Sequence, residues 1–153
     1  MTLLTEEHLA WIGTSDEPVT VEVSRRDIQK YARATEQQLQ EYLSGDEAPP
    51  MFVFNLFGEV CGPGDLRHDG LSRSADTHSG PRLPLNRYMA GGTELRFHRP
   101  IRPGDVLIGV RTLVEMFEKE GRSGPLIFIR RELAITTADG ECVMEEIQTA
   151  IAR

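Results

Sequence analysis

The 153-residue chain has 39% hydrophobic and 27% charged residues, which is enough apolar material for one buried core. Its 17 basic and 24 acidic residues give a net charge of −7, and general binding of nucleic acid or anionic lipid needs clustered positive charge instead. We therefore expect a single domain over residues 1–153, with no nucleic-acid partner and no membrane partner.

The cysteines, Cys61 and Cys142, do not share a Cys-x-x-Cys spacing, so the sequence predicts neither a disulfide framework nor a cysteine zinc site. No pair of histidines, carboxylates or cysteines has metal-ligand spacing, and we expect no metal. Glu6 and Glu7 stand where a signal peptide would be basic, and no apolar run approaches the ~20 residues that span a bilayer. These features favour a cytoplasmic protein with free thiols.

Helix and strand signals alternate in the first part of the chain. Thr5 begins a short capped helix, and valines at every second position over residues 19–23 predict a half-buried strand. Ser24, with an Asp three residues later, resembles a capping box and opens a second helix that should end before Gly45. One face of this helix carries Ile28, Tyr31, Ala32 and Thr35.

Residues 48–58 form the most apolar stretch of the chain. Pro50 suits the first turn of a helix, where its missing N–H has no cost. We therefore predict a mostly buried helix that carries Phe52, Val53, Leu56 and Phe57. A buried strand is the alternative, because periodicity does not distinguish helix from strand in a short apolar run.

Residues 61–84 are rich in Gly, Pro and Ser and show no periodicity. A long irregular segment inside a compact domain is usually a functional flap, a partner-contacting loop or a disordered segment. We expect a long flexible loop at these positions.

After this loop the sequence predicts strands near residues 93–97, 106–117, 126–136 and 143–151. Asp139-Gly140 is a strong hairpin signal before the last of them. The short connections predict an antiparallel meander, because parallel pairs would need a crossover of about a dozen residues. A sheet that is apolar on one face must bury that face, and residues 51–60 are apolar enough to fill it. The fold class is therefore α+β, with an antiparallel sheet wrapped around a central apolar helix.

The order of these elements resembles the hotdog fold of the MaoC-like dehydratase family, and in particular its N-terminal, non-signature type of domain. The most specific piece is Ala-Gly-Gly-Thr-Glu-Leu-Arg-Phe-His-Arg-Pro-Ile-Arg-Pro-Gly-Asp at residues 90–105, because Arg-Pro followed by Gly-Asp recurs at this turn in the family. Ala48-Pro49-Pro50 is similar to the Ala-Pro-Pro that starts the family's central helix. The Glu-Lys-Glu-Gly at 118–121 and the Asp-Gly-Glu at 139–141 strengthen the match.

This resemblance implies a role in reversible water addition to a 2-enoyl thioester carried on coenzyme A or acyl carrier protein, with no other cofactor. In the family the chemistry belongs to a companion domain with the signature Asp-x-Asn-Pro-x-His, whose carboxylate and imidazole handle the water and its protons. That signature does not occur in residues 1–153. The resemblance therefore implies an acyl-thioester-binding and assembly subunit, in a homodimer or in a heterodimer with a catalytic MaoC-like subunit.

Asp65 and His68 imitate an acid/base pair within the Gly-rich segment after the central helix. The family's pair lies before that helix, and a pair that acts on one thioester needs a rigid platform. We favour ordinary loop polarity for both residues, with contact to a partner or substrate next and catalysis as a weak alternative.

Apolar, aromatic and glycine residues are candidates for acyl-thioester binding, as walls of a pocket or as points where a ligand approaches the backbone. These candidates are Met51, Phe52, Phe54, Tyr88, Gly91 and Gly92. Arg99 and Arg102 concentrate positive charge at one turn and are candidates for binding the phosphates of coenzyme A or the pantetheine phosphate. Core packing and a solvated turn are the competing interpretations of these two sets.

Two other functions remain open on the sequence alone. A homodimeric hotdog acyl-CoA thioesterase would use a carboxylate such as Glu59 or Asp65 to activate water. A non-enzymatic acyl-thioester-binding subunit would equally lack the signature. For His98, beside Arg99, we favour a surface or interface position over a role in proton transfer.

Overall fold

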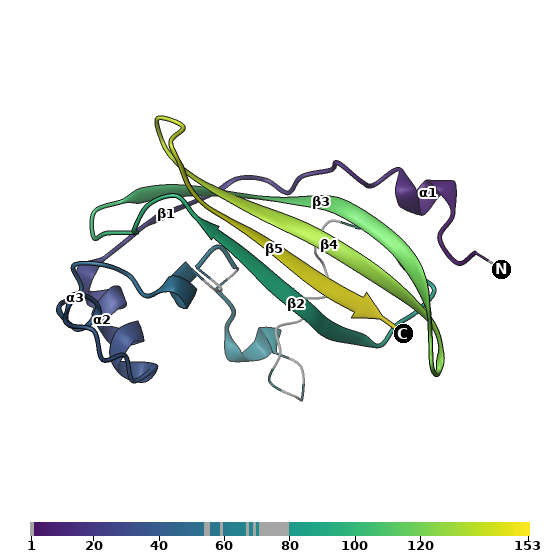
Figure 1. Cartoon of the computed structure of the whole chain (residues 1–153), viewed down its shortest axis with the longest axis horizontal. Coiled ribbons are helices and arrows are strands. Elements are labelled where there is room, and N and C mark those ends of the chain that lie inside the picture. The colour runs from purple at the N-terminus through teal and green to yellow at the C-terminus, as the bar shows by residue number, and fades with distance from the viewer. Residues whose placement is uncertain (1, 54–55, 59, 67, 69, 71–79) are drawn as a thin grey trace.

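The computed structural model describes residues 2–53, 56–58, 60–66, 68, 70 and 80–153. In chain order the helices are α1 (Glu6–Leu9), α2 (Arg25–Ala34) and α3 (Gln40–Ser44), with 3-10 turns η1 (Pro50–Val53) and η2 (Pro63–Asp65). The strands are β1 (Val19–Glu22), β2 (Tyr88–Phe97), β3 (Val106–Gly121), β4 (Gly124–Thr137) and β5 (Cys142–Ala152). They form one curved sheet, with α2 and α3 grouped at one end (Figure 1). The predicted α+β class is confirmed.

The sheet has the order β1-β3-β4-β5-β2, and its neighbouring strands pair antiparallel. The predicted meander is correct for β3, β4 and β5 and wrong for β2, which pairs with β5 instead of with β3. Residues 98–105 are long enough to cross the end of the sheet, and the backbone N–H of His98 donates to Val143 O at 3.0 Å on the way. Strand β2 therefore occupies an edge of the sheet.

Ser24 caps α2 as predicted, since its hydroxyl accepts a hydrogen bond from the Asp27 backbone N–H at 3.0 Å. The single helix predicted to run toward Gly45 is divided into α2 and α3. The chain turns between them at Glu36, whose φ of 53° lies in the left-handed region and cannot continue a right-handed helix. Ile28 and Ala32 of α2 are buried, as the apolar face requires.

The apolar segment enters the inner face of the sheet as the 3-10 turn η1, where a longer helix was predicted over 50–57. Pro49 and Pro50 have no backbone N–H, and the Phe52 N–H donates to Pro49 O at 2.9 Å, an i to i−3 bond that tightens the turn. The predicted burial is confirmed for Phe52, Val53 and Phe57. Phe54 and Glu59 lie outside the described residues.

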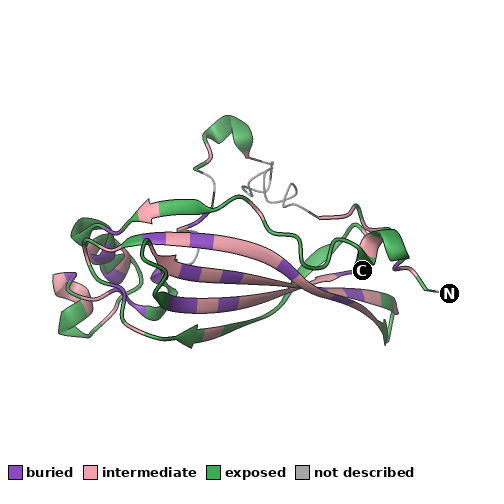
Figure 2. Ribbon diagram, turned by 90° about the horizontal axis from the view of Figure 1, so that it is seen from above, coloured by how far each residue is buried: buried purple, intermediate pink, exposed green. Residues whose placement is uncertain are grey.

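Buried side chains alternate with half-buried ones along β3, β4 and β5 (Figure 2), which is the pattern of a sheet covered on its inner face. The apolar part of this face forms two clusters. One contains Phe52, Phe57, Leu107, Ile135 and Met144 and lies under η1 and α2. The other contains Leu4, Leu113, Met116, Ile127 and Ile129. No helix in the described part of the chain is long and apolar enough to cross a membrane.

The loop predicted at 61–84 is described only in part, because residues 67, 69 and 71–79 lie outside the described residues. The described part includes η2, and Leu83 near the end of the loop packs against the second apolar cluster. Its predicted flexibility stays a prediction.

Candidate functional site

The link between β2 and β3 is held by Arg99. Its guanidinium donates to both carboxylate oxygens of Asp105, at 2.9 and 3.2 Å, and to Glu141 Oε2 at 3.3 Å. Burial alone would raise the pKa of the Asp105 carboxyl, but hydrogen bonds from Arg99 and from the Arg102 backbone N–H outweigh it and hold that pKa below its ordinary value. Hydrogen bonding to Asp105 likewise raises the pKa of Arg99.

Arg99 and Arg102, the two residues predicted to bind phosphate, thus have different environments. Arg99 is half-buried and uses its N–H groups inside the protein. Arg102 contributes its backbone N–H to Asp105 Oδ2 at 2.8 Å and is exposed to solvent. A phosphate could approach the Arg102 side chain without breaking an ion pair seen among the described residues, and Arg99 would reinforce the turn that carries it.

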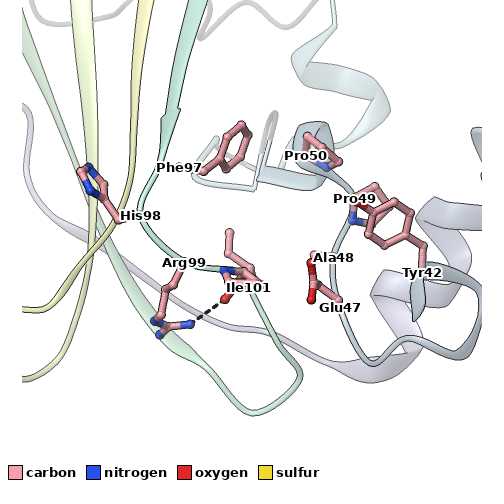
Figure 3. Close-up of a pocket in the computed structure, with 10 residues that line it drawn as sticks. Tyr42, Glu47, Ala48, Pro49, Pro50, Phe97, His98, Arg99 and Ile101 are labelled. Atoms are coloured by element: carbon pink, nitrogen blue, oxygen red, sulfur yellow. Dashed lines mark hydrogen bonds between the residues drawn. The ribbon is translucent and has the colours of Figure 1, made fainter. Parts of the chain in front are cut away.

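A pocket of about 310 Å³ opens beside Arg99, between the end of β2 and the start of η1 (Figure 3). Its walls are Tyr42, Glu47, Ala48, Pro49, Pro50, Phe97, His98, Arg99, Pro100 and Ile101. The Ala48 N–H donates to Ile101 O at 2.8 Å and fixes the two walls relative to each other. Apolar walls with a few polar groups at the rim are typical of small-molecule sites. The Phe97 ring and the two prolines face this space, whereas the Arg99 guanidinium donates to the Pro100 carbonyl oxygen at 2.9 Å (Figure 3).

The predicted binding residues do not gather at one place. Phe52 is buried and packs its ring edge-on against Tyr31, at 5.7 Å between centroids, while Met51 beside it is partly exposed. Tyr88, Gly91 and Gly92 lie on β2, where the register shifts between Ala90 and Gly92. A Cβ at Gly91 would come within 2.9 Å of Thr149 and Ile151, so close strand packing alone requires this glycine.

Asp65 and His68 are both exposed. The Asp65 carboxylate accepts the Gly62 N–H at 3.0 Å and so caps its own 3-10 turn. Within the described residues no hydrogen bond or ion pair joins Asp65 to His68. The geometry fits the interpretation as loop polarity, and the catalytic alternative gains no support.

The sequence analysis missed a cluster of His98, Cys142 and Glu145, whose potential ligand atoms all lie within 4.8 Å of one another. Pairing of β2 with β5 brings them together, and no spacing along the chain reveals it. His98 Nε2 is 2.9 Å from Glu145 Oε2, and Arg96 lies 3.6 Å from the same carboxylate oxygen. The hydrogen bond from His98 chiefly lowers the pKa of Glu145, and the charge on Arg96 acts in the same direction. The Glu145 carboxylate thus already has two partners on neighbouring residues of β2 and its following link.

Comparison with known proteins identifies the family. The family described as the FAS1-like dehydratase domain region matches residues 10–146. The chain belongs to this family of MaoC-like hotdog dehydratases. A curated relative, mesaconyl-C(4)-CoA hydratase of Chloroflexus aurantiacus, is 26% identical over 138 residues, which cover 90% of this chain and 48% of the relative. The chain thus spans about half the length of the curated relative it matches.

Two solved structures share the fold. The ChsH1-ChsH2 complex of Mycobacterium tuberculosis matches with a TM-score of 0.72 and 18% identity, over 96% of this chain and 89% of that one. The C-terminally truncated HadBC (3R-hydroxyacyl-ACP dehydratase) complex of the same organism matches with a TM-score of 0.67 and 21% identity, over 93% of this chain and 97% of that one. The resemblance to the MaoC-like dehydratases and the expected hotdog fold are confirmed.

This MaoC-like chain contains no Asp-x-Asn-Pro-x-His in residues 1–153. Asp46 precedes the Ala-Pro-Pro segment, and hydrogen bonds from Ser44, and then from Arg25, lower the pKa of its carboxyl. The Asp46 carboxylate is therefore engaged by neighbours within the chain.

Proposed function

We propose that this chain is a subunit of an enoyl-thioester hydratase or hydroxyacyl-thioester dehydratase, in which it contributes acyl-thioester binding and assembly. A second MaoC-like chain or domain supplies the catalytic Asp and His. Membership of the dehydratase family supports the reaction class. The name of the curated relative, a hydratase of a coenzyme A thioester, supports the substrate class.

The absence of the signature is the observation that carries the division of labour. Hydration needs a base that takes a proton from water and an acid that returns one, and family members place both groups in the signature. Residues 1–153 contain no Asp-x-Asn-Pro-x-His. Asp65, the remaining alternative with His68, caps its own 3-10 turn, and both residues are exposed.

Three further features support a partner. The chain covers about half of its curated relative, which leaves a second half for another domain or chain to supply. The two solved structures described above are complexes by name. Strand β2 is an edge of the sheet and exposes Tyr88, Met89 and Phe97, so a partner that covered this edge would bury apolar surface and satisfy edge backbone groups.

The pocket beside Arg99 supports a binding role. Its volume of about 310 Å³ suits an acyl or pantetheine group. Arg102 lies in the turn that follows the pocket wall and is the better placed of the two predicted arginines for a coenzyme A or carrier phosphate. Reversal of its charge in the assembled enzyme should raise the KM for the thioester, with little change in kcat.

The proposal is tested by hydration of crotonyl-CoA and longer enoyl-CoA substrates, followed as loss of the enoyl-thioester absorbance. The chain alone should show no turnover, and addition of a MaoC-like chain with the intact Asp-x-Asn-Pro-x-His signature, encoded beside it, should give turnover. Substantial hydration by the pure chain would refute the non-catalytic assignment. Thiol release from acyl-CoA by the pure chain would instead favour the thioesterase alternative.

A further inference from the structure

A band of polar side chains crosses the inner face of the sheet between its two apolar clusters. Arg131 of β4 is paired with Leu113 of β3 on one side and with Gln148 of β5 on the other. Two residues further along the sheet, Leu133 is paired with Arg111 and with Glu146. Cross-strand partners share a face, so both arginines lie on the side that carries Leu113 and Leu133.

Arg111 and Arg131 are diagonal neighbours on adjacent strands, at a separation that lets long side chains meet. Burial lowers the pKa of Arg131, the positive charge on Arg111 lowers it further, and the charge on Asp16 opposes both effects. Within the described residues, neither guanidinium has a hydrogen bond or ion pair to a carboxylate. The charge on Asp16 has a larger effect on the pKa of Arg131 than the charge on Arg111. An anion bound between two half-buried like charges would still stabilise both, because neither has a hydrogen-bonded carboxylate among the described residues.

The neighbouring carboxylates form no ion pair with either arginine in the described structure. Glu146 is 3% exposed, and its Oε1 accepts the Gln148 amide N–H at 2.8 Å, so one of its two oxygens is engaged within β5. Asp16 is held at the sheet edge, where its backbone N–H donates to Arg111 O at 2.8 Å. Its carboxylate acts on Arg131 through charge, without an ion pair in the described structure.

Arg130 shows what a paired arginine looks like in the same strand. It follows the opposite face of β4 and donates to Glu115 at 3.0 Å and to Glu94 at 3.3 Å. Among the described residues, Arg130 on the outer face therefore has acidic partners, and Arg111 and Arg131 on the face that the apolar clusters line have no ion pair.

We propose that Arg111 and Arg131 bind a carboxylate carried by the acyl group of the thioester substrate. Guanidinium groups bind carboxylates by charge-assisted, often bidentate, hydrogen bonds. Apolar side chains on both sides of the band, Leu113 and Leu133 nearest, suit a short carbon chain that ends in this group. The inference rests on the proposed function, since it assigns the substrate class to the acyl-binding role: an acidic acyl thioester rather than a purely aliphatic one.

The test compares succinyl-CoA with butyryl-CoA, which have the same carrier and the same four-carbon chain and differ in the distal carboxylate. Isothermal titration with the assembled complex should give at least about tenfold tighter binding of succinyl-CoA. Arg131→Met and Arg111→Met should each remove this preference and leave butyryl-CoA binding within about twofold. Arg130→Met makes the same change one residue away on the outer face and is the matched control. This variant should keep the preference for succinyl-CoA over butyryl-CoA.

Equal binding of the two thioesters, no measurable binding of succinyl-CoA, or a preference that survives both substitutions would overturn the proposal. A second readout separates a ligand site from a structural role. If the arginines serve the ligand, Arg131→Met should leave the ligand-free Tm unchanged or raise it, whereas a structural counter-ion would lower the Tm when removed. Crotonyl-CoA hydration by the complex checks the proposed function separately, because this substrate has no distal carboxylate.

Discussion

Arg99 holds Asp105 with two hydrogen bonds from one guanidinium, at 2.9 and 3.2 Å, across the link between β2 and β3. Asp105 also accepts the Arg102 backbone N–H, so one carboxylate fixes both the start and the middle of the turn. This arrangement gives a physical role to the Arg-Pro and Gly-Asp pairs that mark the family at residues 99–105. The turn sets the path by which β2 crosses the end of the sheet, and it forms one wall of the pocket.

Asp105→Asn should lower the free energy of unfolding by about 1.5–3 kcal/mol, because it removes a charged acceptor from a half-buried guanidinium. Denaturant unfolding measures this loss. A double-mutant cycle with Arg99→Gln should show that the two effects are not additive. Arg102→Gln is the control, with an expected change within about 0.5 kcal/mol because its side chain is exposed. Additive effects of Asp105→Asn and Arg99→Gln would contradict an energetic coupling between Asp105 and Arg99.

The same ion pair predicts a dependence of stability on pH. The folded-state pKa of Asp105 lies below its reference value of 3.8, so its contribution is fully present above that value and is lost as pH falls through the folded pKa. The stability difference between wild type and Asp105→Asn should stay constant from pH 7 to about pH 5 and shrink below about pH 4. Urea unfolding at pH 7, 5, 4 and 3 measures it. A difference that vanishes by pH 5 would show that the carboxylate is not stabilised in the fold.

Gly109 allows the Phe57 ring to lie directly on β3. A Cβ at this position would be 2.5 Å from Phe57 Cδ1, so Gly109→Ala must displace a buried ring and should cost about 1–3 kcal/mol of stability. Gly64→Ala, with no atom within 4 Å of its Cβ, is the control and should change the stability by less than about 0.5 kcal/mol. Thermal unfolding compares them. A neutral Gly109→Ala would contradict the close packing of the Phe57 ring on β3.

Local signals in the sequence predict the elements better than their arrangement. The Ser24 cap, the alternation along β3 to β5 and the Asp139-Gly140 hairpin depend on neighbours in the chain, and each agrees with the structure. The place of β2 depends on a link long enough to cross the sheet, and no residue in it determines the direction of the crossing. Pro49 and Pro50 permit either an α-helix or a 3-10 turn at the start of the apolar segment, and the sequence alone does not distinguish them.

The candidate sites show the same difference between what local sequence predicts and what the arrangement of the strands determines. His98 and Glu145 become neighbours only when β2 pairs with β5, and Arg111 and Arg131 become neighbours only through the register of β3 on β4. The sequence shows two arginines, 130 and 131, side by side in a strand, and the period of two assigns them to opposite faces. Which face is covered, and therefore which arginine lies inside, follows from tertiary structure alone.

The edge position of β2 predicts that the chain self-associates when it is purified without a partner. Met89 is 46% exposed on this edge, and a lysine there should oppose strand-to-strand pairing by charge repulsion and by loss of apolar contact. Sedimentation velocity should show a dimer for wild type and a shift of at least about tenfold in the dimer dissociation constant for Met89→Lys.

Val19→Lys provides the matched control for this prediction, because Val19 is 40% exposed on β1 at the opposite edge of the same sheet. It should leave the dimer intact if β2 forms the contact. A dimer that resists Met89→Lys and dissociates with Val19→Lys would move the interface to β1. Residues 13–16 continue along β3 beyond β1, with Ser15 bridged to Thr112, so much of that edge is already covered by the chain itself. Within the described ranges, the edge without a neighbouring strand is β2, and a catalytic partner would compete for it with a second copy of this chain.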